Sequence, residues 1–201
     1  MRNTLALIIV LALGTPAIAA DAMPTINNFY IDAYGGLRVP DNLKYDGTAE
    51  DLGIGTSLGA GIGVDTSIPG VSVDLDYMHS TANYSTLGTA LDSQSLMLNG
   101  QYTLDLNMGI KPYAALGLGG VNVTYKSSDS GNALAYQVKL GATGPLTNQV
   151  SWFGEYRYQQ AFSNVSVGAS GYPVEYASHS ILGGIKLSFG DTSSSTGSTG
   201  Y

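Results

Sequence analysis

Charged residues in this chain lie on a single face of each predicted β-strand that contains any. Eight segments alternate apolar with small or polar residues, and they span 28–39, 53–64, 71–80, 93–103, 110–125, 133–143, 150–161 and 176–189. Each charged residue within them has the opposite parity to its strand's aliphatic residues. These residues are Asp32, Arg38, Asp74, Asp76, Lys111, Lys139, Glu155, Arg157 and Lys186. Because successive side chains of a strand point to opposite faces, every strand has one apolar face and one face that is small, polar or charged.

An apolar exterior and a polar interior are typical of transmembrane barrels. We therefore predict an all-β fold, an eight-stranded antiparallel up-and-down transmembrane β-barrel. The nine charged residues then lie inside it. Since an unpaired buried charge is costly, we expect them to form a salt-bridge network with Glu155 and Arg157 near its centre. A barrel of eight strands is just wide enough for its side chains to fill, so no open pore is expected.

The connections between the predicted strands alternate in length. Those after the second, fourth and sixth strands are short and rich in turn-forming residues, whereas the others are longer or more polar. Outer-membrane barrels have short periplasmic turns and longer outer loops. The pattern predicts a bacterial outer-membrane protein with both termini in the periplasm and outer loops at 40–52, 81–92, 126–132 and 162–175.

Aromatic residues cluster near the strand ends, where amphipathic rings prefer the membrane interfaces. For the periplasmic rim we expect Phe29, Tyr30, Tyr102, Trp152 and Phe189. For the outer rim we expect Tyr77, Tyr125, Tyr136, Tyr156, Tyr158 and Tyr176. The rims and the loop pattern favour a membrane barrel over a soluble lipocalin-like barrel, whose two faces would be reversed.

Two features of the strands need a structural explanation. The inward face of the segment 53–64 is almost entirely Gly, which would leave room for long side chains from opposite strands of a narrow barrel. Val121 and Val123 share the parity of Lys111 and would point inward. Either a bulge at Gly119-Gly120 resets the alternation, or this part of the strand stands above the membrane.

The chain ends carry no predicted barrel strand. Residues 1–20 resemble a secretory signal, with Arg2, an apolar run and the small residues Ala19 and Ala20 at a cleavage site. We expect 21–27 to be an N-terminal lead, 28–189 the barrel, and 190–201 a disordered Ser/Thr/Gly tail. The formal net charge is -7 and there is no cysteine, so a nucleic-acid partner and thiol chemistry are not expected.

Several segments together carry a family resemblance. "FYIDAYGGL", "KPYAALGLGGV", "WFGEYRYQ" and "ILGGIKLSF" resemble small outer-membrane barrels of the opacity-protein and OmpA-membrane-domain group. The resemblance implies contact with a host or environmental ligand through the loops. It also implies a setting of outer-membrane lipids and lipopolysaccharide, and insertion by the outer-membrane assembly machinery. Ile185, Leu187 and Phe189 match the assembly signal of this group, although twelve more residues follow Phe189.

No catalytic, cofactor or metal site is predicted. His79 and His179 lie near strand ends beside serines, but adjacent strand residues face opposite sides, so His179 is badly placed to activate Ser178 or Ser180. We expect a non-enzymatic surface antigen or adhesin-type barrel. The alternatives are a narrow porin-like channel or transporter, a soluble lipocalin-like barrel and an outer-membrane lipid-modifying enzyme.

Overall fold

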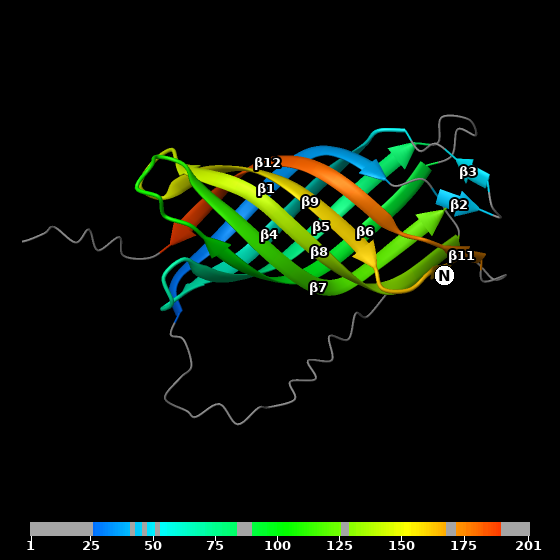
Figure 1. Cartoon of the computed structure of the whole chain (residues 1–201), viewed down its shortest axis with the longest axis horizontal. Helices are drawn as coiled ribbons and strands as arrows, with labels where there is room; N and C mark the ends of the chain where they lie inside the picture. Colours follow the sequence, from blue (N-terminus) through cyan, green and yellow to red (C-terminus); the bar gives the residue numbers. More distant parts are fainter. Residues whose placement is uncertain are drawn as a thin grey trace, which may run out of the picture.

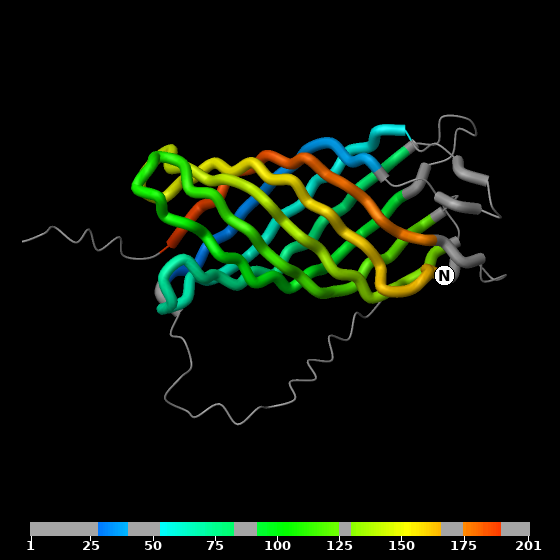
Figure 2. The backbone as a smooth tube through the Cα atoms, in the orientation of Figure 1, coloured from blue at the N-terminus to red at the C-terminus, as the bar shows by residue number. Residues whose placement is uncertain are grey.

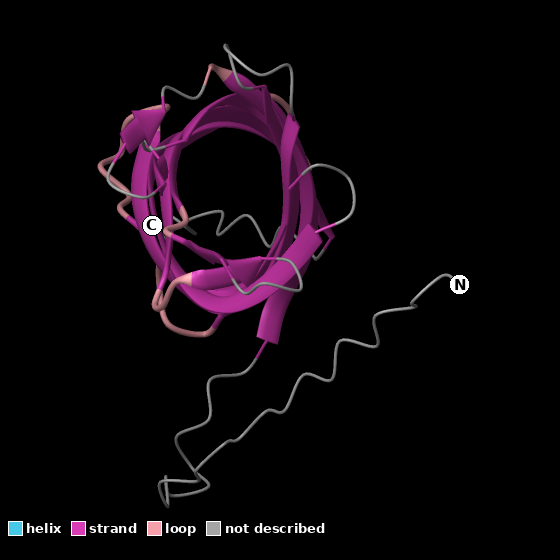
Figure 3. Ribbon diagram, turned by 90° about the vertical axis from the view of Figure 1, so that its right-hand side faces the viewer, coloured by secondary structure: helices cyan, strands magenta, loops and turns pink. Residues whose placement is uncertain are grey.

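The computed structural model is a closed antiparallel barrel of eight strands (Figure 1). It describes residues 26–40, 43–45, 48–50, 53–83, 90–125, 129–167 and 172–189. The barrel strands are β1 (Ile26–Pro40), β4 (Gly55–Thr66), β5 (Val71–Asn83), β6 (Ala90–Thr103), β7 (Lys111–Tyr125), β8 (Asp129–Pro145), β9 (Val150–Ala161) and β12 (Ala177–Phe189). Each pairs with its chain neighbour, and β12 pairs with β1 to close the ring seen in Figure 3. The predicted fold class is confirmed, and no membrane-spanning helix occurs among the described residues.

The two ends of the barrel differ, as Figure 2 shows. The turn end carries the short connections, the start of β1 and the end of β12. The loop end carries two additional hairpins, which the sequence did not predict. They are β2 (Leu43–Tyr45) with β3 (Thr48–Glu50), and β10 (Val165–Val167) with β11 (Tyr172–Val174). The predicted secretory signal (residues 1–20) and the predicted tail (residues 190–201) lie outside the described residues.

The strands are strongly tilted. Cross-strand pairs can be followed from one strand to the next around the ring, starting at the outward-facing Phe29. The path returns to β1 at Val39, ten residues further along the strand. Such a stagger accompanies a tilt of roughly 35–45° in a closed barrel. Residues that pair across strands therefore lie at different heights along the barrel axis.

The aliphatic face of each strand lies outside, as the parity predicted. Leu58, Leu98, Leu116 and Ile181 are each at least half exposed, whereas their chain neighbours Ser57 and Asn99 are buried in the lumen. Two rim predictions are wrong, because Tyr30 and Tyr176 are buried inside the barrel. The side chain of Tyr125 lies outside the described set. An apolar exterior of this kind matches hydrocarbon and not water.

The glycines on the inner face of β4 make room for side chains of the adjacent strand β1. A Cβ at Gly59 would overlap the Tyr34 ring, and one at Gly63 would overlap the Tyr30 ring. The prediction that opposite strands need this space is therefore wrong. The tilt explains the difference, since a long side chain on β1 leans along the wall over its neighbour.

Replacing Gly59 by Ala tests this packing. The added methyl group meets the Tyr34 ring, so we expect Gly59→Ala to lower the free energy of unfolding by about 1–3 kcal/mol. Gly100→Ala is the matched control, because its Cβ would meet no atom within 4 Å. Its effect should stay within about 0.5 kcal/mol in urea titrations of the folded barrel in lipid vesicles. Equal effects of the two substitutions would contradict the packing argument.

No bulge interrupts β7 at Gly119-Gly120. Its register with both β6 and β8 is continuous from end to end, so a phase reset is wrong. Val121 and Val123 point inward and are almost fully buried. On the outer face of β7, the first large side chain after Leu118 is the polar Asn122. Asn122 pairs in register with Gln94 on β6 and Asn132 on β8. Polar outside and apolar inside is the pattern of a water-soluble barrel, which favours the alternative that this part of β7 stands above the hydrocarbon.

Candidate functional site

The lumen of the turn-end half contains a buried ionic network. Arg157 Nη1 lies 2.8 Å from Asp76 Oδ1, and Arg157 Nη2 lies 2.6 Å from Glu155 Oε1. Lys139 Nζ lies 3.4 Å from one carboxylate oxygen of each of Asp74 and Asp76. All five residues are buried, and β5, which carries the aspartates, stands diametrically opposite β9, which carries Arg157. The network therefore spans the barrel and joins opposite walls.

Hydroxyl and amide groups complete this network. The Tyr34 hydroxyl donates to Asp76 Oδ1 at 2.8 Å, and the Tyr113 hydroxyl donates to Glu155 Oε2 at 2.8 Å. Asn99 Nδ2 donates to Asp74 Oδ1 at 2.6 Å. Buried charges are tolerated when such hydrogen bonds satisfy their remaining lone pairs. These tyrosines and the asparagine were not predicted, although their parity places them inside.

Two further predicted residues line the same space. Asp32 and Lys186 are cross-strand partners on β1 and β12, and Lys186 Nζ lies 4.0 Å from the centroid of the Tyr30 ring. Both side chains border a cavity of about 20 Å³ together with the network residues. A cavity of this volume holds about one water molecule. The turn-end half of the lumen is thus filled by its own side chains.

The other two predicted network residues lie elsewhere. Lys111 is partly exposed at the turn end, where Nζ lies 2.6 Å from Asp105 Oδ2. The Lys111 ammonium and the Asn107 backbone N–H lower the pKa of the Asp105 carboxyl. Arg38 is fully buried near the loop end, where Nη1 donates to Ser93 Oγ at 2.8 Å and Cζ lies 5.3 Å from the Tyr176 ring centroid. Parity places both residues on the inner side but does not give their height.

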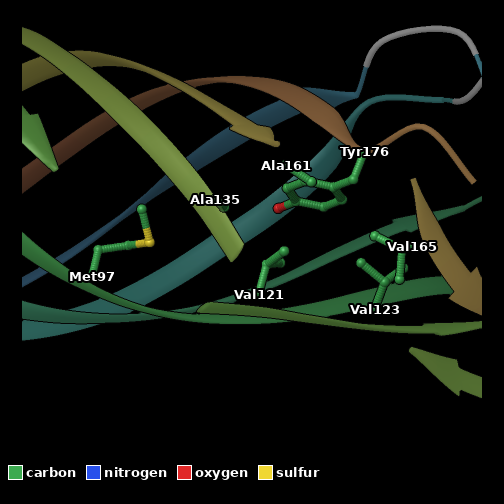
Figure 4. Packing of buried hydrophobic residues seen from close by; sticks show 7 residues of the cluster. All are labelled: Met97, Val121, Val123, Ala135, Ala161, Val165 and Tyr176. Carbon is green, nitrogen blue, oxygen red and sulfur yellow. The ribbon is translucent and has the colours of Figure 1, made fainter. Parts of the chain in front are cut away.

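The lumen of the loop-end half is closed by apolar side chains. They come from β6 to β10 and from the residue before β12, and Figure 4 shows them as Met97, Val121, Val123, Ala135, Ala161, Val165 and Tyr176. A second apolar cluster inside the barrel contains Tyr34, Met78, Tyr113, Phe153 and Leu182. The expectation that the inner face is only small, polar or charged is wrong at the large apolar members of these clusters, such as Met97, Met78, Phe153 and Leu182.

Outward-facing rings gather near the loop end of β8, β9 and β12. The Tyr156 hydroxyl and His179 Nδ1 are 2.6 Å apart, and the Tyr158 and His179 ring centroids are 4.9 Å apart. Ser178 and Ser180, by contrast, are buried in the lumen. His179 and these serines therefore lie on opposite sides of the barrel wall. The arrangement matches interfacial packing of amphipathic rings and not nucleophile activation.

The predicted assembly residues lie at the turn end of β12. Ile185 and Phe189 are exposed on the outer face, and Phe189 packs against Phe29 of β1 with ring centroids 5.9 Å apart. Leu187 pairs with Ile31 on β1. The contact lies where the first and last strands close the ring. The side chain of Phe189 thus contributes to barrel closure whatever its role in assembly.

Solved structures with this fold include outer-membrane proteins. Neisserial surface protein A matches with a TM-score of 0.65 and 20% identity, over 80% of this chain and 97% of its own. Outer membrane protein AlkL matches with a TM-score of 0.53 and 20% identity, over 90% and 98%. A major outer membrane protein from Thermus thermophilus matches with a TM-score of 0.52 and 17% identity, over 81% and 98%. At these identities the likeness concerns the fold alone.

Sequence comparison supplies the family. No curated protein matches this chain. The family model described as "Outer membrane protein beta-barrel domain" matches residues 5–197, which include every strand of the barrel. Together with the apolar exterior and the buried ionic network inside the barrel, this match places the protein in the bacterial outer membrane. The chain belongs to the outer membrane protein beta-barrel domain family.

Proposed function

We propose that the protein is a sealed, non-enzymatic barrel that holds the loop end outside the cell, where its connections contact a host or environmental ligand. The observation that carries the proposal is the filled lumen. An ionic network occupies the turn-end half, and an apolar cluster closes the loop-end half. A barrel filled in this way supports an anchoring role better than a transport role.

The shape of the loop end also supports this role. Strands β5 to β8 continue beyond the apolar belt, and the loop end adds the hairpins β2–β3 and β10–β11. The paired residues Gln94, Asn122 and Asn132 are polar and face outward in this part of β6, β7 and β8. Strands that rise above the membrane lift the connecting segments away from the lipid headgroups. Loops positioned by a rigid scaffold are the usual carriers of recognition.

Conductance measurements test the sealed lumen. We expect the folded protein in planar lipid bilayers to show no steady single-channel current, because its side chains leave a cavity of only about 20 Å³ in the network region. A porin in the same membranes serves as the positive control. Reproducible, voltage-stable current steps from the purified protein would reject the sealed barrel and favour the narrow-channel alternative.

Cysteine labelling tests the orientation. The chain contains no cysteine, so single substitutions provide unique labelling sites. We expect Asn164→Cys, exposed at the loop end, to react with a membrane-impermeant maleimide on intact cells. Asn148→Cys, exposed in the turn between β8 and β9, should react only after the outer membrane is permeabilised. The reverse pattern would show that the loop end faces the periplasm.

A contact function requires binding that depends on the loop-end connections. We expect cells that display the barrel to bind host cells or extracellular matrix more than cells without it. Replacing residues 41–52 and 168–171 by short Gly-Ser turns should abolish the gain, and it keeps β1 and the buried Val165 that belong to the barrel. Binding that survives both replacements would contradict an adhesive role and leave the sealed anchor in place.

A further inference from the structure

The three short connections at the turn end are apolar and nearly uncharged. They are residues 67–70, 104–110 and 144–149, and Asp105 is the only charged residue within them. Six large apolar side chains of these connections are each between 46% and 59% exposed. They are Ile68, Leu104, Leu106, Met108, Ile110 and Leu146, which we call the turn surface. Turns that stand in water are normally polar, so an exposed apolar surface here marks a contact.

The three connections lie side by side at the end of the barrel. The Thr103 N–H donates to Gly70 O at 2.8 Å, which joins the connection 67–70 to the end of β6. A Cβ at Gly144 would lie 3.1 Å from Gly109 O, so the connection 104–110 lies against the end of β8. The turn surface therefore extends over three adjacent hairpins.

The turn surface continues the lipid face of the barrel. Leu104, Ile110 and Leu146 have the outward parity of β6, β7 and β8, respectively. The Leu104 N–H donates to Pro112 O at 2.9 Å, so the pairing of β6 with β7 still holds at Leu104. The outward rows that face hydrocarbon thus run directly into the turns.

The single charge of these connections is compensated. Lys111 Nζ lies 2.6 Å from Asp105 Oδ2, and the Asn107 N–H donates to Asp105 Oδ1 at 3.0 Å. A paired and hydrogen-bonded charge is tolerated at low polarity far better than a lone one. The loop-end connection 40–52, by contrast, carries Asp41, Lys44, Asp46, Glu50 and Asp51. The two ends of the barrel therefore differ in charge as well as in length of connection.

The height of the turn surface matches the second edge of the hydrocarbon. Each residue of a strand tilted by about 40° advances about 2.6 Å along the barrel axis. On the outer face of β7, Leu118 is apolar and Asn122 is polar, so we place the loop-end edge of the hydrocarbon between them. An apolar band about 25 Å tall that begins there ends at about Ile110. The turn surface then lies where acyl chains meet headgroups.

We propose that the turn surface binds the phospholipid leaflet at its end of the barrel, with its side chains between the glycerol groups and the upper acyl chains. A lipid partner fits because the surface is continuous with the lipid-facing rows and has no unpaired charge. Tyr102 and Trp152, whose amphipathic rings suit a membrane interface, lie beside Gly70 and Gly144 of the same connections. The inference goes beyond the proposed function and does not depend on it, because a channel would seat its turns in the same way.

Depth-dependent fluorescence quenching tests the contact. Trp152 is the only tryptophan, so Leu106→Trp in a Trp152→Phe background reports on the turn surface alone. In phosphatidylcholine vesicles whose acyl chains carry bromine near the glycerol end, we expect its fluorescence to be lower than in unbrominated vesicles. Ser130→Trp in the same background, exposed at the loop end of β8, should not be quenched. Equal emission of Leu106→Trp in the two kinds of vesicle would overturn the proposal, and is expected if the turns stand in water or serve a soluble protein.

Stability provides a second and independent readout. The double variant Leu106→Ser with Met108→Ser replaces two half-exposed apolar side chains of the turn surface. Loss of their lipid contact should lower the folding equilibrium constant in vesicles about tenfold or more. Asn148→Ser, a polar and exposed position in the neighbouring connection, is the control and should leave this constant unchanged. A double variant as stable as the parent would show that water already covers these side chains and would overturn the proposal.

Discussion

Replacing Arg157 by Met will lower the free energy of unfolding by about 3–5 kcal/mol. The side chain joins Asp76 on one wall to Glu155 on the opposite wall, and both carboxylates are almost fully buried. Without the guanidinium, these carboxylates remain in the lumen without their main counter-charge, which is the costly way to break a buried pair. Urea titration of the barrel folded in lipid vesicles measures the loss.

Two comparisons show whether the lower free energy of unfolding results from breaking the ionic network. Lys111→Met removes a cation whose pair with Asp105 is exposed at the turn end, and its effect should be below about 1 kcal/mol. The double variant Asp76→Asn with Arg157→Gln removes one charge of each sign. It should recover part of the stability that Arg157→Gln alone loses, because the sites are coupled. Strictly additive effects, or a Lys111→Met loss as large as that of Arg157→Met, would show that the network does not stabilise the barrel.

An arginine scan along β7 will locate the outer edge of the hydrocarbon. We expect Leu116→Arg, on the lipid face within the apolar belt, to cost about 2–4 kcal/mol. Asn122→Arg should cost no more than about 1 kcal/mol, because Asn122 and its cross-strand neighbours Gln94 and Asn132 are all polar, as expected in water or among headgroups. Leu118→Arg should fall between them. The measurement is again urea unfolding in lipid vesicles.

The arginine scan also tests why the loop-end part of β7 is polar outside and apolar inside. Val121 and Val123 are buried inside at the level where the outer face of β7 becomes polar. If Asn122→Arg costs as much as Leu116→Arg, then β7 does not stand above the membrane at Asn122. The inward valines would then have to be explained as an apolar plug within the bilayer.

The predicted strands and the faces of their charged residues agree closely with the structure. Alternation is a local property, because the stereochemistry of an extended chain turns each side chain away from the next. The predicted strand boundaries at the loop end agree less well with the structure. Strand β8 begins at Asp129, not at 133, since the polar residues there still pair with β7. The hairpins β2–β3 and β10–β11 were missed because three-residue strands carry almost no periodicity.

The partners within the lumen could not be predicted in the same way. Arg157 and Asp76 are 81 residues apart and meet because β5 and β9 stand on opposite sides of the ring. Lys111 and Lys139 have the same parity on neighbouring strands, yet one lies at the turn end and the other in the network. Parity distinguishes inside from outside and carries no information on height.

The sequence by itself determined which residues share each face of a strand, because that depends only on a period of two residues, and the aromatic rims and loop pattern favoured lipid on the apolar face. The tertiary structure alone decided which buried charges pair and which, like Arg38, do not. The physical reason is the tilt of the strands. A stagger of ten residues around the ring sets the height of every side chain, and it arises from the closure of all eight strands together.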